Sequence, residues 1–352
     1  MYTLYHTVIY SITTLIATFL STLCITHNCT AQVLGGRSTY NFIKLAPTPQ
    51  VSALGGGVVA VNNACNGVAQ YNPALLTHAT INELQVSNNF MYGGIKHVHA
   101  NYTTKLNQGK VNIAANYLNY GSIISTNAQG NILGSFTPSD YYIQASYAKQ
   151  YNAYWHYGAS IKLIGSNYAQ YSSYAASASF AANYNDTSNH ITFGILIKNI
   201  GVQLKKYTTI REDVPFDLQL GISKKLAKAP IEFILTIANT HQWNITYADA
   251  AFENEYDIET KTRNKILDNV ARHCTLATII DLNKYIQFTV AYNYLRRKEL
   301  TLFNIGNGLT GFSAGATIQL YAYCIQFAKA YYQNSKAYNQ IGVSIQFSKL
   351  HF

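Results

Sequence analysis

Apolar side chains alternate with small or polar ones along most of the chain, from about residue 82 to the C-terminus. The clearest run places Trp155, Tyr157, Ala159, Ile161 and Leu163 on one side and His156, Gly158, Ser160 and Lys162 on the other. A period of two residues is that of a β-strand, whose successive side chains point to opposite faces of a sheet. The pattern therefore predicts an all-β structure for this part of the chain.

About fourteen such runs follow one another, and most are about 10–14 residues long, whereas strands of soluble sheets usually have about 5–6 residues. Strands of that length suit a tilted crossing of a lipid bilayer. A soluble sandwich would show the same alternation, so the strand length and the loop pattern decide between them. We predict a closed antiparallel transmembrane β-barrel with strands near 82–92, 95–104, 110–121, 139–149, 154–165, 173–184, 190–199, 214–225, 230–241, 270–282, 285–295, 309–319, 321–332 and 339–352.

The connections alternate between tight turns and longer loops, as in bacterial barrels that have both chain ends on the periplasmic side. The turns near Asn107, Tyr151, Asp186, Lys228 and Asn283 are short. The opposite connections include the long segments 122–138, 201–213, 242–269 and 296–308, while those near Gly93 and Ser335 are short exceptions. We expect the longer loops to lie on the outer side.

The first 31 residues contain no Asp, Glu, Lys or Arg and are mostly apolar between Val8 and Ile25. Small residues around Ala31 provide a plausible cleavage point, so residues 1–31 are interpreted as a secretory signal peptide. An uncleaved membrane anchor is the alternative, because about 18 apolar residues could just span a bilayer. The predicted organisation is a leader at 1–31, a glycine-rich segment at 32–81 and the barrel at 82–352.

Composition supports a membrane location. Only 11% of residues are charged, against about 25% in soluble proteins. The chain has 30 tyrosines, a residue that gathers at lipid–water boundaries. The net charge of +10 suits anionic lipid or glycan headgroups better than nucleic acid in an exported protein.

The glycine-rich segment before the barrel is too short to form its own domain. Gly55 and Gly56 permit a tight turn, and Asn72-Pro73 favours a turn that enters a short helix. We expect this segment to fold into the barrel lumen as a hatch; an arm in the periplasm is the alternative.

No catalytic, cofactor or metal motif is convincing. Ser146 and Lys149 have the spacing of a Ser-x-x-Lys nucleophile, but residues three apart in a strand point to opposite sides. His97 and His99 share a strand face without a completing Cys or carboxylate, so they are interpreted as lumen-facing. Three cysteines outside the leader, Cys65, Cys274 and Cys324, are interpreted as small apolar residues.

Partner binding is expected at the outer loops, because the strands are committed to lipid and lumen. The chain ends on Phe352, and we interpret this terminal aromatic residue as a barrel-assembly signal. The basic residues chosen as candidate partner contacts are Lys205, Lys206, Arg211, Lys261, Arg263, Lys265, Arg296, Arg297 and Lys298.

Several blocks of the sequence resemble the PorQ family, FadL-like outer-membrane proteins of the type IX secretion system of Bacteroidetes. The Asn-Pro-Ala turn is shared widely among FadL-like barrels, and the later blocks resemble the PorQ family more narrowly. The blocks are Gly35–Phe42, Ala53–Gly56, Asn72–Leu76, Gly134–Tyr141, Ile197–Gly201 and Pro215–Lys224.

The resemblance implies a FadL-like barrel in the bacterial outer membrane that anchors a PorZ-like surface protein. PorU-like and PorV-like subunits and lipopolysaccharide would be further partners, in a complex that processes secreted cargo and attaches it to lipopolysaccharide. The main alternative is a FadL-type transporter of hydrophobic substrates. A general porin is less favoured, because the predicted lumen side is rich in Ser, Gly, Ala and Asn and poor in charge.

Overall fold

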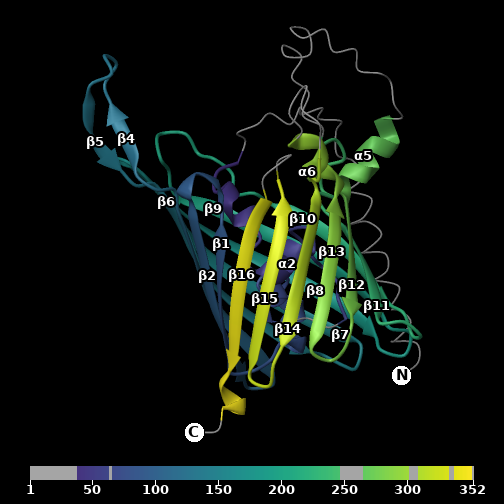
Figure 1. Ribbon diagram of the computed structural model, residues 1–352. Helices are drawn as coiled ribbons and strands as arrows, with labels where there is room; N and C mark the ends of the chain where they lie inside the picture. The colour runs from purple at the N-terminus through teal and green to yellow at the C-terminus, as the bar shows by residue number, and fades with distance from the viewer. Residues whose placement is uncertain (1–37, 63–65, 246–264, 301–307, 333–336, 351–352) are drawn as a thin grey trace, which may run out of the picture.

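The computed structural model of the chain is a closed antiparallel β-barrel of fourteen strands. It describes residues 38–62, 66–245, 265–300, 308–332 and 337–350. Neighbours along the chain pair with each other, and β1 closes the barrel against the last strand, β16. Figure 1 shows tight turns at one end of the barrel and longer excursions at the other. The closed antiparallel barrel of fourteen strands expected from the sequence is therefore confirmed.

All fourteen predicted strands are present at the expected places. Their bounds are β1 Glu83–Phe90, β2 Lys96–Leu106, β3 Gly109–Asn119, β6 Ser139–Gln150, β7 Trp155–Tyr168, β8 Tyr171–Asp186, β9 Ile191–Lys205, β10 Asp217–Lys225, β11 Ile231–Ile237, β12 Cys274–Asp281, β13 Ile286–Asn293, β14 Phe312–Gln319, β15 Tyr323–Tyr331 and β16 Ala337–Gln346.

The alternation in the sequence corresponds to the two faces of the wall. In β7 the outward Ile161 is 65% exposed, whereas the next side chain, Lys162, points inward and is 6% exposed. The same division places large apolar residues such as Ile113, Leu163 and Phe233 on the outside of their strands. An apolar exterior around a polar interior is the arrangement of a barrel that lies in a bilayer.

The segment between β3 and β6 was predicted as a loop, but it contains a two-stranded hairpin. The strands β4 (Ile123–Thr126) and β5 (Ile132–Phe136) pair only with each other. They project from the outer end of the barrel, away from its wall (Figure 1). The sequence signal was weak because both strands are short and neither has one consistently buried face.

Several strand ends also differ from the predictions. Strand β9 continues to Lys205, so it extends into the segment 201–213 that was predicted as a loop. The helix α5 (Lys265–His273) occupies the expected start of β12, and α6 (Tyr294–Glu299) begins where β13 was expected to continue. The last strand stops at Gln346 and is followed by the 3-10 turn η4 (Phe347–Lys349), so the prediction of a strand reaching residue 352 is wrong. Phe352 itself, the predicted leader and Cys65 lie outside the described residues, and their predicted roles stay predictions.

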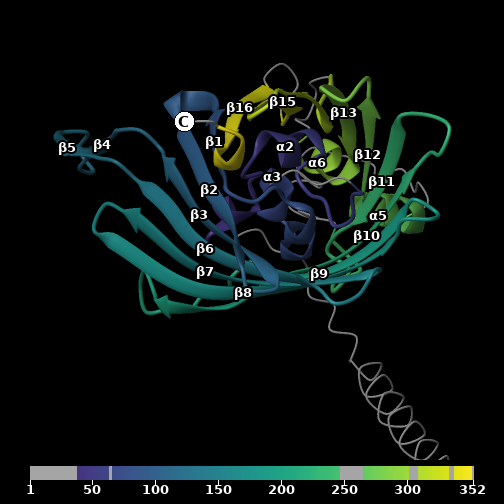
Figure 2. The same ribbon diagram turned by 90° about the horizontal axis from the view of Figure 1, so that it is seen from below.

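Residues 38–81, described except for 63–65, lie inside the barrel and form a plug (Figure 2). The plug has four short helices: η1 (Asn41–Lys44), α2 (Pro49–Ala53), α3 (Asn66–Ala69) and η2 (Pro73–His78). A further 3-10 turn, η3 (Tyr92–Gly94), joins β1 to β2. Leu54, Val58 and Leu75 of the plug pack in one apolar cluster with wall residues such as Ile234 and Ile279. The described part of this segment thus packs against the inner wall of the barrel, and its role as a hatch stays a prediction.

Among the described residues, none of the helices is both apolar and long enough to span a bilayer.

Candidate functional site: the plug and the outer mouth of the barrel

Wall glycines allow the plug to approach the strands closely. A Cβ atom on Gly158 of β7 would lie 2.3 Å from the backbone carbonyl carbon of Pro73. A Cβ on Gly315 of β14 would lie 2.5 Å from the Cβ of Ala53, and one on Gly221 of β10 would lie 2.7 Å from the Cβ of Val59. Because no side chain fits at these points, the plug seats against three separate parts of the wall.

The glycine turn predicted at Gly55 and Gly56 is held by a buried arginine. Both glycines have positive φ angles, 87° and 93°, which glycine adopts without a Cβ penalty. The Gly55 carbonyl accepts hydrogen bonds from the Arg296 guanidinium at 2.8 Å and from the Asn293 side chain at 3.1 Å. Arg296 also donates to the Ser313 hydroxyl at 3.0 Å. One side chain thus joins the plug to β14.

Asn72 and Pro73 form the second predicted turn and start η2. The Asn72 side-chain oxygen accepts from the Ala74 backbone N–H at 2.9 Å and caps the helix, with Pro73 at its first position. The Asn72 amide donates to the Val59 carbonyl at 2.6 Å and to Asn183 of β8 at 3.1 Å. The Asn72 side chain therefore joins two segments of the plug backbone, at Val59 and Ala74, to the wall strand β8.

A chain of side-chain amides continues this connection across the barrel interior. Gln70 of the plug donates to Asn112, Asn112 donates to Asn101 at 3.1 Å, and Asn101 donates to Gln85 at 3.0 Å. Gln85 in turn donates to Gln326 at 2.9 Å. Buried polar groups that satisfy one another in this way rigidify a structure. The described residues thus place the plug and a network of side-chain amides inside the barrel, which disfavours a wide water-filled porin channel.

A cavity of about 550 Å³ remains at the outer mouth, between the start of the plug and the wall. Ser38–Phe42 form one side of it. Tyrosines form much of the other side: Tyr120 after β3, Tyr168 at the end of β7, and Tyr207 in the segment after β9. The rings of Tyr40 and Tyr207 are tilted relative to each other, with their centroids 6.3 Å apart. The cavity thus combines aromatic faces with phenol oxygens.

Two acidic residues, Asp140 and Glu212, line this cavity, and Asp140 is the buried one, 3% exposed. It accepts hydrogen bonds from the hydroxyls of Tyr120 at 2.6 Å and Tyr168 at 2.9 Å, and from Ser166. Burial, followed by the hydrogen bond to Asp140, raises the pKa of Tyr120. Burial likewise raises the pKa of Tyr40 in the plug. These phenols therefore remain protonated donors, and the carboxylate is satisfied by the wall rather than left free for chemistry.

The basic residues predicted as outer-loop contacts fall into separate groups. Lys205 donates to the Ser172 hydroxyl at 2.5 Å, Lys206 to the Thr209 carbonyl at 3.0 Å and Arg211 to the Gln203 carbonyl at 3.3 Å, all around the end of β9. Lys298 in α6 forms an ion pair with Asp268 at 3.6 Å.

Two further candidate contacts, Arg297 and Lys265, lie within the described residues. Arg297 donates to the Thr310 carbonyl at 3.2 Å. Lys265 is the first residue of α5, and Lys261 and Arg263 lie outside the described residues. Partner binding by the outer loops stays a prediction.

Arg296 is the exception, because the structure does not place it on an outer rim. It is 8% exposed and its guanidinium packs on the Tyr332 ring, 4.2 Å from the centroid. From the sequence, Arg296 was expected to contact a partner at the outer loops together with Arg297 and Lys298. The helix α6 instead turns this one member of the cluster inward, toward the plug.

The side chains of the weaker sequence motifs lie on opposite faces of a strand or are buried in the lumen. Ser146 is buried and faces the lumen, while Lys149 is exposed on the other face of β6, as the strand period requires. His97 and His99 are buried in the lumen, and His97 lies 2.7 Å from the Asn116 amide. Within the described ranges, no group of three or more His, Cys, Asp or Glu side chains is placed to hold a metal ion.

Tyr40, Asp140 and the glycines that seat the plug were not singled out from the sequence. The abundance of tyrosine indicated an interface, but nothing local showed which rings converge on one cavity. Gly158 was placed only on the small or polar side of its strand.

The sequence of the chain matches no protein-family model and no curated protein. The structure does resemble solved barrels. The toluene transporter TodX of Pseudomonas putida is similar over 84% of this chain and 96% of its own, with a TM-score of 0.50 and 10% sequence identity. A deltaS2S3 mutant of TodX, described as a monoaromatic hydrocarbon channel, covers 85% of this chain and 99% of its own, with a TM-score of 0.52 and 11% identity. At such identity the likeness establishes a shared fold.

Proposed function

We propose that the chain is an outer-membrane barrel that binds a small hydrophobic or aromatic molecule at its outer mouth and passes it inward beside the plug. The observation that carries this proposal is the tyrosine-lined cavity between Ser38–Phe42 and the wall. Ligand pockets are mostly apolar and carry a few placed polar groups, and this cavity has aromatic faces with phenol oxygens at their edges. The fold shared with a toluene transporter supports the same class of ligand.

The location follows from the exterior of the barrel. Its apolar outward face requires lipid, and closed barrels are one of two backbone arrangements that satisfy every peptide group in a bilayer. The predicted leader would export the chain. A bacterial outer membrane, with the tight turns in the periplasm, is the location that we infer.

Uptake into vesicles that contain the purified barrel tests the transport proposal. The probes are radiolabelled toluene and a long-chain fatty acid, with glucose as a polar control. Thr208 lines the cavity and is exposed, whereas its neighbour Thr209 is exposed but does not line it. Thr208→Trp should fill the cavity and reduce uptake about tenfold or more, and Thr209→Trp should not. Equal uptake by both variants and by empty vesicles would refute transport through this cavity.

A second candidate function is attachment of a surface protein, as the PorQ resemblance implies. The β4–β5 hairpin favours it. The segment 119–139 contains no charged residue, and Ile124, Ile132 and Leu133 are each more than 60% exposed. An apolar two-stranded ribbon with free edges on the outer side is suited to pairing with another chain.

Affinity purification from native membranes tests attachment. A PorZ-like protein recovered in equal amounts with the unaltered barrel, and lost with the double variant Ile124→Asn, Leu133→Asn, would support it. The matched control is Ser125→Asn, on the same hairpin. Recovery of no surface protein with any form of the barrel would count against attachment, and copurified hydrophobic ligand would favour transport.

A further inference from the structure

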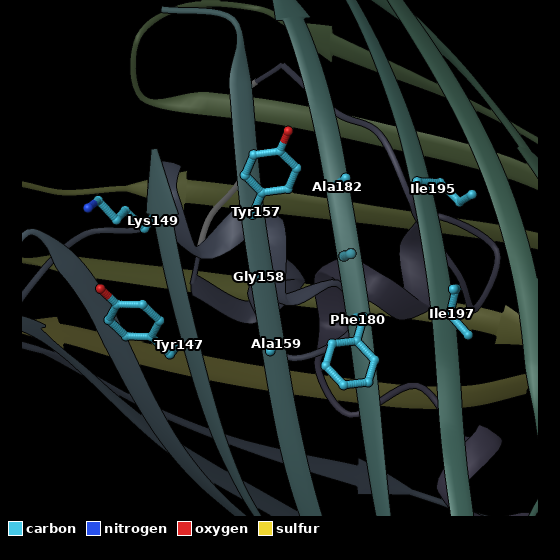
Figure 3. Close-up of a pocket in the computed structure, with 10 residues that line it drawn as sticks. Tyr147, Lys149, Tyr157, Gly158, Ala159, Phe180, Ala182, Ile195 and Ile197 are labelled. Carbon is cyan, nitrogen blue, oxygen red and sulfur yellow. The ribbon is translucent and has the colours of Figure 1, made fainter. Parts of the chain in front are cut away.

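The outward face of β6–β9 has a hollow of about 440 Å³ near the end with the tight turns. Figure 3 shows the side chains that surround it. We propose that this hollow, called here the wall groove, binds an acyl chain of one phospholipid from the periplasmic leaflet, with the anionic headgroup at Lys149. The inference rests on the bilayer location proposed above and on neither transport nor attachment.

The groove arises from two small outward residues on neighbouring strands. One row across the sheet is Lys149, Tyr157, Ala182 and Ile195, and the next is Tyr147, Ala159, Phe180 and Ile197. Ala159 and Ala182 are diagonal neighbours in these rows. They leave a depression between the rings of Tyr157 and Phe180, as Figure 3 shows.

The walls of the groove are apolar and open to the surroundings. Phe180 is 50% exposed, Tyr157 46%, and Tyr147 and Ile195 are each 40% exposed. Aromatic and aliphatic side chains around a small-residue floor offer van der Waals contact on several sides to a flexible hydrocarbon chain.

Aromatic residues place one end of the groove at the lipid–water boundary. Trp155 stacks on Tyr157, with ring centroids 6.1 Å apart, and packs edge-on against Tyr184 at 5.3 Å. Tyr154 stacks on Tyr184 at 5.7 Å. Such clusters mark the headgroup level of a membrane protein, and the β6–β7 turn beside them is one of the tight, periplasmic ones.

Lys149 supplies the charge at this level. It is exposed, lies opposite Tyr157 in the register, and is the one charged side chain that lines the groove. A lysine at the headgroup level attracts anionic lipid. The combination of an apolar groove with a cation at its interfacial end fits a lipid with a phosphate headgroup better than a neutral hydrocarbon or a second protein.

The wall is also thin here, which links the groove to the plug. Gly158 lies between the two rows, and the inner side of Gly158 touches the backbone of Pro73 and Ala74 in η2. A lipid in the groove and η2 in the lumen would therefore contact opposite faces of the same stretch of β7. We expect the bound lipid to stabilise the docked plug.

Native mass spectrometry tests the proposal. The barrel is reconstituted into vesicles of phosphatidylglycerol and phosphatidylethanolamine, extracted in mild detergent and washed stepwise. The unaltered barrel should retain one phospholipid longest, with a preference for phosphatidylglycerol. Ala182→Phe should abolish retention, and Lys149→Gln should weaken phosphatidylglycerol binding about fivefold.

Two matched controls separate the groove from the rest of the wall. Ala314→Phe adds the same ring to an outward alanine of β14, and Lys228→Gln removes a lysine from another tight turn; both should leave retention unchanged. Migration of unheated samples on gels verifies that each variant has closed its barrel. Equal retention by Ala182→Phe and the unaltered barrel, or a dimer that Ala182→Phe disrupts, would overturn the proposal. A barrel that transports its probe but retains no lipid would refute this inference alone.

Discussion

At the scale of single residues, the function of a side chain depends on which way its backbone turns it. Arg296 and Lys298 are two positions apart in one basic cluster, yet Arg296 holds the Gly55 carbonyl inside the barrel and Lys298 pairs with Asp268 at its outer end. A buried guanidinium with two acceptors contributes far more to stability than an exposed ion pair.

Replacement of Arg296 should therefore loosen the plug. Arg296→Ala removes hydrogen bonds from a charged donor to Gly55 and Ser313, so we expect the barrel to lose about 2–3 kcal/mol of unfolding free energy. Lys298→Ala should cost less than about 1 kcal/mol. Denaturant unfolding in detergent micelles measures both variants. An Arg296→Ala barrel as stable as the Lys298→Ala barrel would show that the hydrogen bonds of Arg296 to Gly55 and Ser313 add nothing to the unfolding free energy.

A second prediction at this scale concerns Gly158, where the wall contacts η2 of the plug. Gly158→Val would place atoms within the backbone of Pro73 and Ala74, so η2 must move away from β7. We expect faster protease cleavage within residues 66–81 and a lower melting temperature. Ala145→Val, on the outward face of β6, adds two methyl groups to the lipid side and should change neither. Cleavage at the rate of the unaltered chain would contradict the close packing.

At the scale of elements, η2 is positioned by both of its ends. Asn72 caps its start, and the Lys110 ammonium donates to the Thr77 carbonyl at 2.8 Å near its end, where a cation is favoured. His78 is the last residue of η2, and its ring lies 4.7 Å from that of His156. Burial, with the nearby His156 and Lys110, lowers the pKa of His78 to about 4.

This pKa predicts that acid weakens the docking of η2. Released from the wall, His78 would titrate near 6.5, so between pH 6.5 and 4 the released state binds more protons than the docked one. Docking is thus fully stable above pH 6.5 and loses up to about 3 kcal/mol as the pH falls toward 4. Hydrogen exchange of residues 73–78, corrected for intrinsic rates, measures this. His78→Gln should remove the dependence; an unchanged dependence in that variant would assign it to another group.

At the scale of the whole molecule, the plug and the wall form one packed unit. Apolar clusters join the plug to the wall on several sides, and the wall glycines allow the plug to contact the strand backbone directly. A barrel of fourteen strands would enclose a wide lumen if it were empty. In the described residues, the plug and the amide network lie within that space.

Deletion of residues 38–81 should therefore open the barrel. We expect steady ion conductance across planar bilayers, where the unaltered chain gives little. Replacement of residues 121–137 by a short turn is the control, because the β4–β5 hairpin lies outside the lumen and should leave conductance low. If the deletion prevents assembly, the double variant Arg296→Ala, Asn72→Ala tests the same point. A fully assembled plugless barrel that conducts no ions would contradict plug-based closure.

The sequence by itself determined the fourteen strands, the face that each side chain takes, the end of the barrel that carries the tight turns, and the two turns of the plug. These follow from the period of two and from the local chemistry of Gly, Asn and Pro, which act over a few residues. Tertiary structure alone decided that Arg296 faces the plug, that Gly158 and Gly221 seat it, that tyrosines from distant strands meet around Asp140, and that Ala159 and Ala182 adjoin in a groove. Such contacts depend on strand register and closure across the barrel, and those join residues far apart in the chain that no local pattern connects.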